Sequence, residues 1–280
     1  MQYILWSLGG NRMIDCHIHL ERGNYTVEWL NKFVETAVHR GIDEIYLLEH
    51  SHRFREFASM YESITDYSSY QKEWFERKRN AYLSIKDYIL FIEKVKQITY
   101  PIKLKFGLEV CYFEGYEHLI NEILRSYPFD FATGSVHWVD GFGFDHKKEL
   151  WDNIDVDKLY VRYYEIMEKL IESGLFTGVA HPDSIKAFGH KPSFNLVGIY
   201  GKIAELLNKY NMYAEQSGGL HLNYSSNCEL GMNEAMLKVF THKGVRILTA
   251  SDAHKPEDVG ANIIELLNLA SSNTSPEYTS

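Results

Sequence analysis

Histidines and carboxylates recur along the chain in short clusters, each directly after a run of apolar residues. The first cluster contains His17 and His19, separated by one residue. Alternate side chains of an extended strand point to the same side, so these two imidazoles can reach one point. Asp252 and His254 repeat the spacing near the other end of the chain. Imidazole and carboxylate donors suit zinc, manganese or iron(II), so the pattern indicates a metal site.

Four further clusters follow apolar runs in the same way. One cluster alone is weak evidence, because histidines also serve in cores and turns, but six clusters after six runs predict a metal centre. A carboxylate such as Glu109 can bridge two ions about 3.5 to 4 Å apart, which favours a centre with more than one ion. The candidate ligands are His17, His19, His50, Glu109, His137, His181, Asp252 and His254. Five histidines elsewhere in the chain are interpreted as surface or core-edge residues: His39, His118, His146, His190 and His242.

The elements that must position these residues alternate along the chain. Seven short β-rich runs are each followed by a segment of helical period, which predicts βα units with parallel strands. Gly41, Gly174 and Gly244 each stand where a helix is expected to end. A closed barrel is favoured over an open doubly wound sheet because no GxGxxG loop follows the first strand. The predicted strands are residues 13–17, 44–48, 102–108, 129–136, 176–180, 212–215 and 245–250, and one long helical run is expected over 70–98.

The composition indicates which class of molecule the protein binds. The 280 residues carry 29 basic and 38 acidic side chains, a net charge of −9, which disfavours nucleic acid and anionic lipid as partners and favours a small molecule. The opening segment lacks a basic signal region, no apolar run is long enough to span a membrane, and the three cysteines form no CxxC pair, so a cytoplasmic protein is expected. We expect a single domain over 13–270, a leader of doubtful role over 1–12 and a flexible tail over 271–280. The oligomeric state is not readable from one chain.

The strings DCHIHL, LLEHS, GLEV, GSVHW, VAHPD and TASDAH, in this order, resemble the motifs of the polymerase and histidinol phosphatase (PHP) family of metal-dependent phosphoesterases, most closely its histidinol-phosphatase branch. The resemblance implies a distorted (β/α)7 barrel with two to three divalent ions, Zn, Mn or Fe, at the C-terminal ends of the strands. By analogy one ion takes His17, His19, Glu109 and Asp252, a second takes Glu109, His137 and His181, and a third takes His50 and His254.

The sequence departs from this family in three places. Many members have another histidine shortly after the first pair, but here the stretch continues through Glu21 without one. Either Glu21 substitutes as an oxygen ligand, or the third site is weaker or empty. The segment 216–221 lacks the family's arginine, and Cys111 stands where an aspartate is frequent. These changes affect substrate recognition more than metal chemistry.

The resemblance implies a histidinol-phosphatase, a phosphomonoester hydrolase that converts histidinol phosphate and water to histidinol and phosphate. Asp252 is the expected proton acceptor for the attacking water, and His254, His52 or a metal-bound water would protonate the leaving alkoxide. The main alternative is a related phosphatase or phosphodiesterase that acts on another small phosphate ester, such as a nucleotide. An amidohydrolase is disfavoured because no lysine lies at a strand end. The remaining alternative is a metal-binding module without turnover.

Substrate contacts are expected from side chains near the motifs. Arginine suits phosphate because its donors are forked, and the candidates are Arg22, Arg53 and Arg162. His52 and the Tyr112, Glu114, Tyr116 and Glu117 group are candidates for the rest of the substrate. The long segment 52–97 is either a lid, with Tyr61, Tyr67, Tyr70 and Trp74 facing the substrate, or an outer helical cover.

Overall fold

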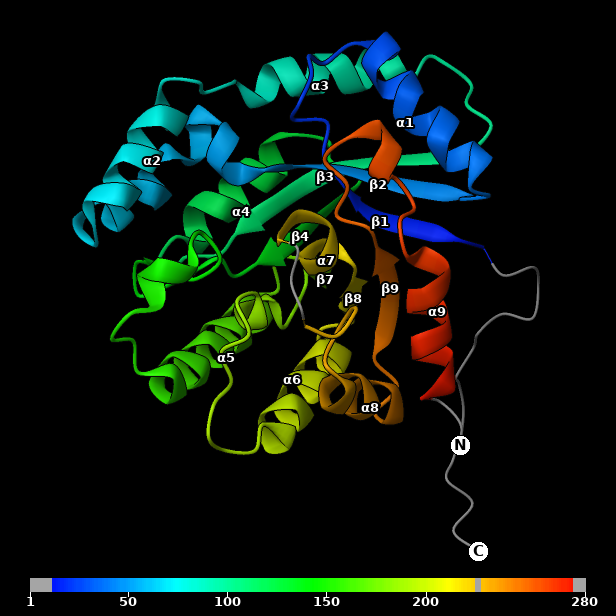
Figure 1. Ribbon diagram of the computed structural model, residues 1–280. Helices are drawn as coiled ribbons and strands as arrows, with labels where there is room; N and C mark the ends of the chain where they lie inside the picture. The colour runs from blue at the N-terminus through cyan, green and yellow to red at the C-terminus, as the bar shows by residue number, and fades with distance from the viewer. Residues whose placement is uncertain (1–11, 225–227, 274–280) are drawn as a thin grey trace, which may run out of the picture.

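A parallel sheet of seven strands forms the centre of the computed structural model, which describes residues 12–224 and 228–273 (Figure 1). The predicted leader lies outside the described residues except for Arg12, and so do residues 274–280 of the predicted tail. The strands follow in the order β1 (Ile14–Ile18), β2 (Glu44–His50), β3 (Lys103–Cys111), β4 (Phe131–Ser135), β7 (Gly178–Val179), β8 (Tyr213–Ser217) and β9 (Arg246–Ala250). Each of the seven predicted strands overlaps one of these. A small antiparallel pair, β5 (Trp138–Val139) and β6 (Phe142–Gly143), lies apart from the sheet.

The two edge strands approach each other, so the sheet is nearly closed into a barrel. Thr249 Oγ1 donates to the carbonyl of Ile14 at 2.6 Å, and the Ser251 amide donates to Asp15 Oδ1 at 2.8 Å. Just beyond β1, the His19 amide donates to the carbonyl of Ala253 at 2.8 Å. These bonds join β9 to β1 and confirm the distorted (β/α)7 barrel, which excludes the open doubly wound alternative.

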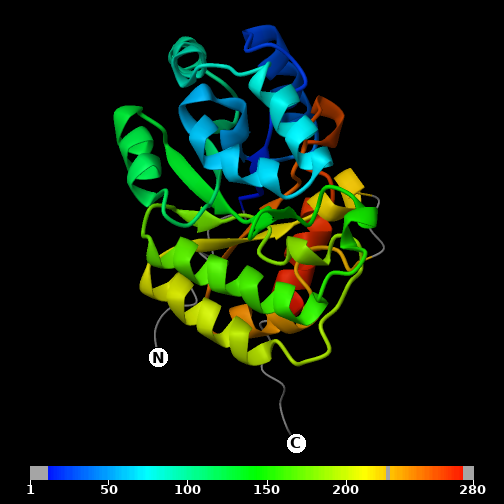
Figure 2. The same cartoon turned by 90° about the vertical axis from the view of Figure 1, so that its left-hand side faces the viewer.

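Helices surround the strands on the outside. Figure 2 shows the helices of the first half of the chain above the strands and those of the second half below them. Side chains of Thr26, Ser68, Ser84, Asp155 and Asn233 accept a backbone hydrogen bond and start five of the helices. The helices are α1 (Val27–His39), α2 (Ser69–Arg79), α3 (Ile85–Val95), α4 (Glu117–Ser126), α5 (Val156–Glu172), α6 (Val197–Lys209), α7 (Gly219–Tyr224), α8 (Glu234–His242) and α9 (Ile263–Ser272).

The three glycines predicted at helix ends have the backbone conformation that this role requires. Their φ angles are 71° at Gly41, 65° at Gly174 and 70° at Gly244, in the left-handed region that side chains disfavour. Each one follows α1, α5 or α8 and lets the chain reverse into the next strand. The glycine signals therefore marked the helix boundaries correctly.

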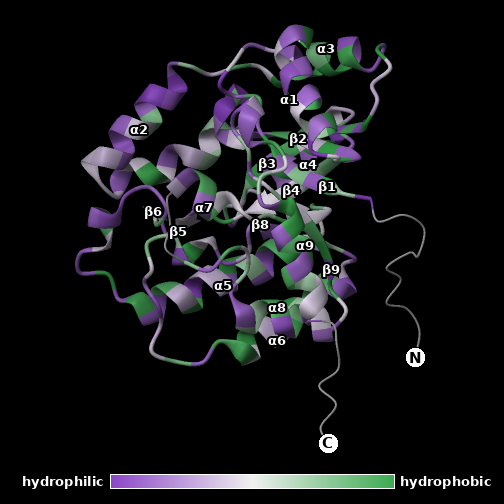
Figure 3. Ribbon diagram, turned by 45° about the vertical axis from the view of Figure 1, so that its right-hand side comes forward, coloured by the Kyte–Doolittle hydropathy of each residue, from purple (hydrophilic) through white to green (hydrophobic). Residues whose placement is uncertain are grey.

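Apolar side chains fill both the barrel and the layer around it. Cys16, Tyr46, Leu48, Phe131, Tyr213 and Ala250, which come from five different strands, form one buried cluster. A much larger cluster lies between the strands and the surrounding helices. Figure 3 shows that apolar residues concentrate on the strands, whereas α2 is largely hydrophilic. The barrel is therefore a packed core, and its polar residues gather at one end.

The prediction of one long helix over 70–98 is wrong. The chain forms α2 and α3 with an irregular segment between them, and a long 3₁₀ segment, η2 (Arg55–Asp66), precedes α2. The break occurs because Leu83 exchanges backbone hydrogen bonds with Arg53 and Arg55, at 2.8 and 3.1 Å. Ser84 then caps the second helix with its side chain. A contact between residues 30 apart thus overrides the local helical period.

Short 3₁₀ turns occupy several of the loops after the strands. They are η1 (Ser51–Arg53), η3 (Lys148–Trp151), η4 (Ser184–Lys186) and η5 (Pro256–Asp258). Three of them, η1, η4 and η5, follow β2, β7 and β9. Within residues 12–224 and 228–273, no helix is long and apolar enough to cross a membrane.

Candidate metal centre

A cavity of about 470 Å³ opens at the C-terminal ends of the strands. Its lining includes most of the side chains that the sequence singled out as ligands. His17 and His19 lie beneath this lining and are fully buried. The structure thus brings together residues that are up to 237 positions apart in the chain, from His17 to His254. The predicted ligands that line the cavity are Glu21, His50, Glu109, His137, His181, Asp252 and His254.

Four donor atoms at the floor of the cavity have the spacing of a metal site. His17 Nε2 and His19 Nε2 are 2.9 Å apart, and they lie 3.4 and 3.5 Å from Glu109 Oε2. Asp252 Oδ1 is 3.7 and 3.6 Å from the same two nitrogens. Ligands about 2.1 Å from a tetrahedral ion are separated by roughly 3.4 Å, and the four distances from the imidazole nitrogens to the carboxylate oxygens are close to this spacing.

A second group of donors shares Glu109 with the first. His137 Nε2 and His181 Nε2 lie 2.8 and 3.2 Å from Glu109 Oε1, the other oxygen of the carboxylate. His17, Glu109 and His181 also form a group whose donor atoms all lie within 4.8 Å of one another. One buried carboxylate therefore directs its two oxygens to two neighbouring groups, as a bridging ligand does.

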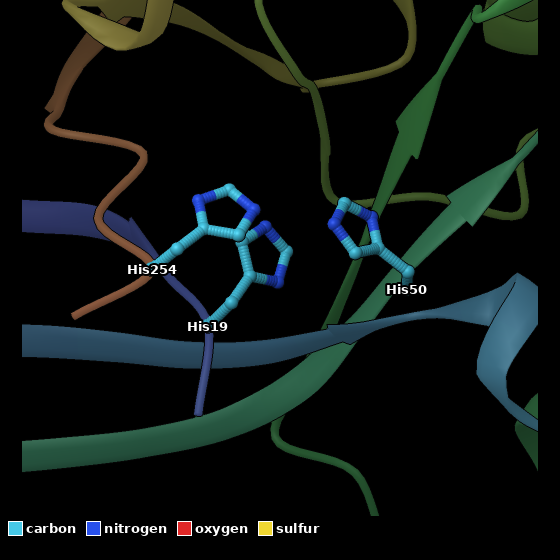
Figure 4. A group of neighbouring side chains, drawn as sticks. All are labelled: His19, His50 and His254. Carbon is cyan, nitrogen blue, oxygen red and sulfur yellow. The ribbon is translucent and has the colours of Figure 1, made fainter. Parts of the chain in front are cut away.

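A third group lies at the edge of the cavity and consists of imidazoles. His19, His50 and His254 offer nitrogens within 4.8 Å of one another, and Figure 4 shows their rings gathered around the same space. Glu21 Oε1 lies 3.4 Å from His254 Nε2. Glu21 thus lies where it could act as the oxygen ligand that the sequence analysis considered for the third group. His50 and His254 are partly exposed, unlike His17 and His19.

The carboxylates of the cluster are held in the ionised form, which is the form that binds a cation. Burial by itself raises the pKa of Glu109 and of Asp252, but the surrounding imidazoles outweigh burial and hold both pKa values well below the usual range. The pKa of Glu21 is likewise lowered, to about 2, by His50, His19 and His254 against the effect of burial. Burial and the neighbouring His50 lower the pKa of His19 well below its usual value, so His19 is neutral, the form that binds metal.

Several buried donor atoms of the cluster have no hydrogen-bond partner among the described residues. They include His19 Nδ1, His181 Nδ1 and Glu109 Oε2. Glu109 Oε2 lies 2.6 Å from His50 Nδ1, but not in hydrogen-bond geometry. A buried carboxylate oxygen without a hydrogen-bond donor is costly, by about 1 to 3 kcal/mol or more. A divalent ion among the donor atoms would remove this cost, so the residues present fit a metal centre.

Two carboxylates that the sequence analysis missed orient the imidazoles from outside. Glu215 lies 2.9 and 3.0 Å from His17 Nδ1 with its two oxygens, and Asp145 Oδ2 lies 2.6 Å from His137 Nδ1. A carboxylate at Nδ1 fixes the ring and leaves Nε2 directed at the metal. Glu215 ends the sixth predicted strand, so its position was a usable signal. Asp145 lies in a loop, and no sequence pattern there indicated a role in the site.

Backbone strain also marks the site. His181 and Asp252 have φ angles of 28° and 59°, which are unfavourable for residues with side chains. Gly219 packs so closely on Asp252 that a Cβ atom there would lie 2.2 Å from Asp252 Oδ2. The Gly219 position thus requires glycine, because the carboxylate of Asp252 occupies the space.

The expected substrate contacts divide into two sets. His52 and Arg22 line the cavity, as do Tyr61, Tyr70 and Trp74 of the long segment. Tyr67 packs on Phe142 instead, and α3 covers the outside of the sheet (Figure 1). One part of the segment therefore lines the cavity, and another part covers the sheet. His146, interpreted as a surface or core-edge residue, in fact lines the cavity, with its ring 4.5 Å from that of Trp138.

The remaining candidates are not brought to the cavity lining. Arg53 pairs with Glu49, which also accepts from the Leu20 amide. Arg162 pairs with Glu114 and with Asp140. Tyr112 donates to Glu117. Tyr116 donates to the carbonyl of Ser59. The structure uses these side chains to join loops and helices outside the cavity.

Fold and site together define a parallel barrel whose strand ends carry clustered metal-binding residues. The family model of the PHP domain matches residues 15–223, and the chain belongs to this family. It is 24% identical over 257 residues to a Deinococcus radiodurans protein named probable histidinol-phosphatase, covering 89% of this chain and 88% of the relative. A Schizosaccharomyces pombe protein of the same name is 23% identical over 248 residues, covering 83% and 77%.

A solved structure shares the fold. Histidinol phosphate phosphatase from Lactococcus lactis, in complex with zinc, L-histidinol and phosphate, superposes with a TM-score of 0.68 at 18% sequence identity. The match covers 94% of each chain. The likeness establishes the barrel architecture over nearly the whole length.

Proposed function

We propose that this protein is a metal-dependent phosphomonoester hydrolase that converts histidinol phosphate and water to histidinol and phosphate. The observation that carries the proposal is the set of three donor groups in one cavity, two at its floor and one at its edge, joined by Glu109 and His19. Phosphomonoester hydrolysis needs concentrated positive charge beside the phosphoryl oxygens, and such a donor set can hold it. The names of the relatives support histidinol phosphate as the substrate.

The proposed ligand assignment follows the three groups. The first ion is held by His17, His19, Glu109 and Asp252, and the second by Glu109, His137 and His181. The third is held by His50 and His254, with Glu21 as an oxygen ligand. Zinc, manganese and iron(II) all accept these donors.

Divalent ions bring two things to this reaction: they lower the pKa of water, and they offset charge on the phosphoryl oxygens. The protein supplies rigidity, because Glu215 and Asp145 hold the His17 and His137 rings by hydrogen bonds at Nδ1. Asp252 is the proposed acceptor of the proton from water, and its Oδ2 atom accepts from Asn223 Nδ2 at 3.1 Å.

The proton donor for the leaving alkoxide depends on the third group. His254 Nδ1 lies 3.0 Å from the carbonyl of Asp252, so in the neutral ring Nε2 is the free nitrogen. If Nε2 of His254 holds an ion, it cannot donate a proton, and the two roles expected of His254 exclude each other. His52 lines the same cavity and is the alternative donor.

An aromatic wall offers a place for the leaving group. The ring centroids of Trp74 and Trp138 are 5.4 Å apart, and the His146 ring lies 5.1 and 4.5 Å from them. Such a wall can stack on the imidazole of histidinol. It can also stack on a nucleobase, so a nucleotide is the second candidate substrate.

The test is phosphate release from L-histidinol phosphate by protein loaded with zinc or with manganese. The comparison panel contains nucleoside monophosphates, sugar phosphates and a phosphodiester. We expect histidinol phosphate to be preferred, with a kcat/KM above about 10⁴ M⁻¹s⁻¹. Faster turnover of another ester would support the phosphatase activity but would contradict histidinol phosphate as the substrate. Absence of turnover across the panel would contradict the enzyme and favour a metal-binding module.

A further inference from the structure

Three cations line the cavity without a carboxylate partner. Arg22, Arg77 and Lys78 all belong to the lining, and within the described part of the chain none has a carboxylate oxygen within 4 Å. Arg53 and Arg162, by contrast, are held by Glu49 and Glu114. An anion that enters the cavity would have to displace these ion pairs to reach Arg53 or Arg162, but it meets the other three directly.

Two of the free cations come from one face of α2. Tyr70, Trp74, Arg77 and Lys78 all line the cavity, at the spacing i, i+4, i+7 and i+8 that places residues on one side of a helix. Basic residues in a last helical turn also favour the helix dipole. The helix dipole does not explain why Arg77 and Lys78 line the cavity, because Arg79 of the same turn is outside the lining.

Lys78 lines the cavity beside the aromatic ring of Trp74. Its ammonium lies 5.5 Å from the centroid of the Trp74 ring, and Trp74 in turn lies 5.3 Å from the ring of His52. Burial lowers the pKa of Lys78, and Glu21, the carboxylate beside His254, opposes this effect. A partly buried ammonium without a close counter-ion gains more from an incoming dianion than one in open solvent.

We propose that Lys78, with Arg77 beside it, binds the phosphoryl group of the substrate at the mouth of the cavity, which makes α2 a substrate-binding helix. The proposal rests on the proposed phosphatase function and adds the protein cations that recognise the phosphate. Ions held by the donor set at the floor would bind the reacting end from below, and α2 supplies charge from the side. Charge-assisted bonds to phosphate oxygens are the strong ones, so a single lysine is sufficient for a measurable effect.

The experiment compares Lys78→Ala with Lys72→Ala, and Arg77→Ala with Arg79→Ala. Lys72 and Arg79 lie on the same helix, exposed and outside the cavity, and Arg79 shares the last turn with Arg77. The readouts are kcat and KM, the calorimetric affinity of the metal-loaded protein for inorganic phosphate, and metal content. We expect Lys78→Ala to raise KM and the phosphate Kd about 10- to 100-fold. The change in kcat should be small, because binding is lost equally in the ground and transition states.

Arg77→Ala should have the same effect at a smaller size, about 3- to 10-fold, since its side chain is more exposed. Lys78→Arg should restore most of the phosphate affinity. Neither control should change KM, and no variant should change the metal content. A structural role of Lys78 would instead lower the melting temperature and leave the phosphate Kd unchanged.

The outcomes separate this proposal from the function on which it rests. If the wild-type protein hydrolyses no ester, the phosphatase function fails, and phosphate calorimetry still decides the role of Lys78. If Lys78→Ala changes the phosphate Kd no more than Lys72→Ala does, the role of α2 is overturned while the phosphatase stands. A wild-type protein that binds metal but no phosphate would also overturn the role of α2.

Discussion

The floor and the edge of the metal centre are built differently. At the floor, His17 and His19 are fully buried, Glu109 is almost so, and carboxylates complete the first group. At the edge, His50 and His254 are 17% and 14% exposed, and Glu21 approaches only one of them, at 3.4 Å. Buried, oriented donors with two carboxylates bind a divalent ion more tightly than exposed imidazoles with one. The comparison predicts an ordered loss of ions, with the third group emptied first.

The largest effect is expected from Glu109→Gln, which removes the carboxylate shared by the first two groups. Both groups should lose metal, and turnover should fall by at least about 10²-fold. Metal analysis of the purified variant and its kcat measure the two losses together. Glu44→Gln is the control, because Glu44 is a buried glutamate on β2 that pairs with Lys103 and Lys105 instead. Normal metal content in the Glu109→Gln variant would show that Glu109 is not a bridging ligand of the two groups.

Glu215→Gln tests whether the hydrogen bond between Glu215 and the His17 ring strengthens metal binding by the donor group at the floor. The amide cannot hold the His17 ring as the carboxylate does, so metal affinity should fall about 10- to 100-fold. Competition with a chelator of known affinity measures the change. An unchanged affinity would mean that the burial of His17, and not its partner, sets the strength of the floor group.

Glu21→Gln is directed at the edge alone. A chelator titration of the wild-type protein should release metal in at least two steps, and the variant should weaken only the first step, by about 10-fold or less. Cobalt substitution, followed by its absorption spectrum, distinguishes the steps. If Glu21→Gln weakens every step equally, the floor and the edge are one cooperative unit and the comparison fails.

The smallest effect is expected from Arg162→Ala, far from both groups. Arg162 bridges Glu114 and Asp140 at the protein surface, so its loss should cost less than about 1 kcal/mol of unfolding free energy. KM should remain unchanged, because Arg162 lies outside the cavity lining. Denaturant unfolding and steady-state kinetics measure the two quantities. A raised KM with normal stability would return Arg162 to the substrate site.

Local sequence patterns were sufficient for the strands and for the histidines and carboxylates at their C-terminal ends, whereas the closed barrel was expected mainly from the family resemblance. Runs of period 2 and 3.6 are properties of the backbone, so the strands and most helices followed from them. His17 and His19 on β1 illustrate this, since alternate residues of a strand must face one side. The long segment over 70–98 was divided differently because a backbone contact between Arg53 and Leu83 cannot be read from period alone.

The sequence by itself determined the seven strands, their parallel direction and the side chains at their C-terminal ends, because these depend on the short-range spacing of residues and on the alternation of strands with helices. Only the tertiary structure decided which charged groups are free and which are paired. Arg162 is paired with Glu114, which is 48 residues away in the sequence, and His17 is hydrogen-bonded to Glu215, which is 198 residues away. Such pairings depend on how loops and helices pack around the barrel, which no local period encodes. For the same reason the cations of α2 face the cavity, while Arg53 does not.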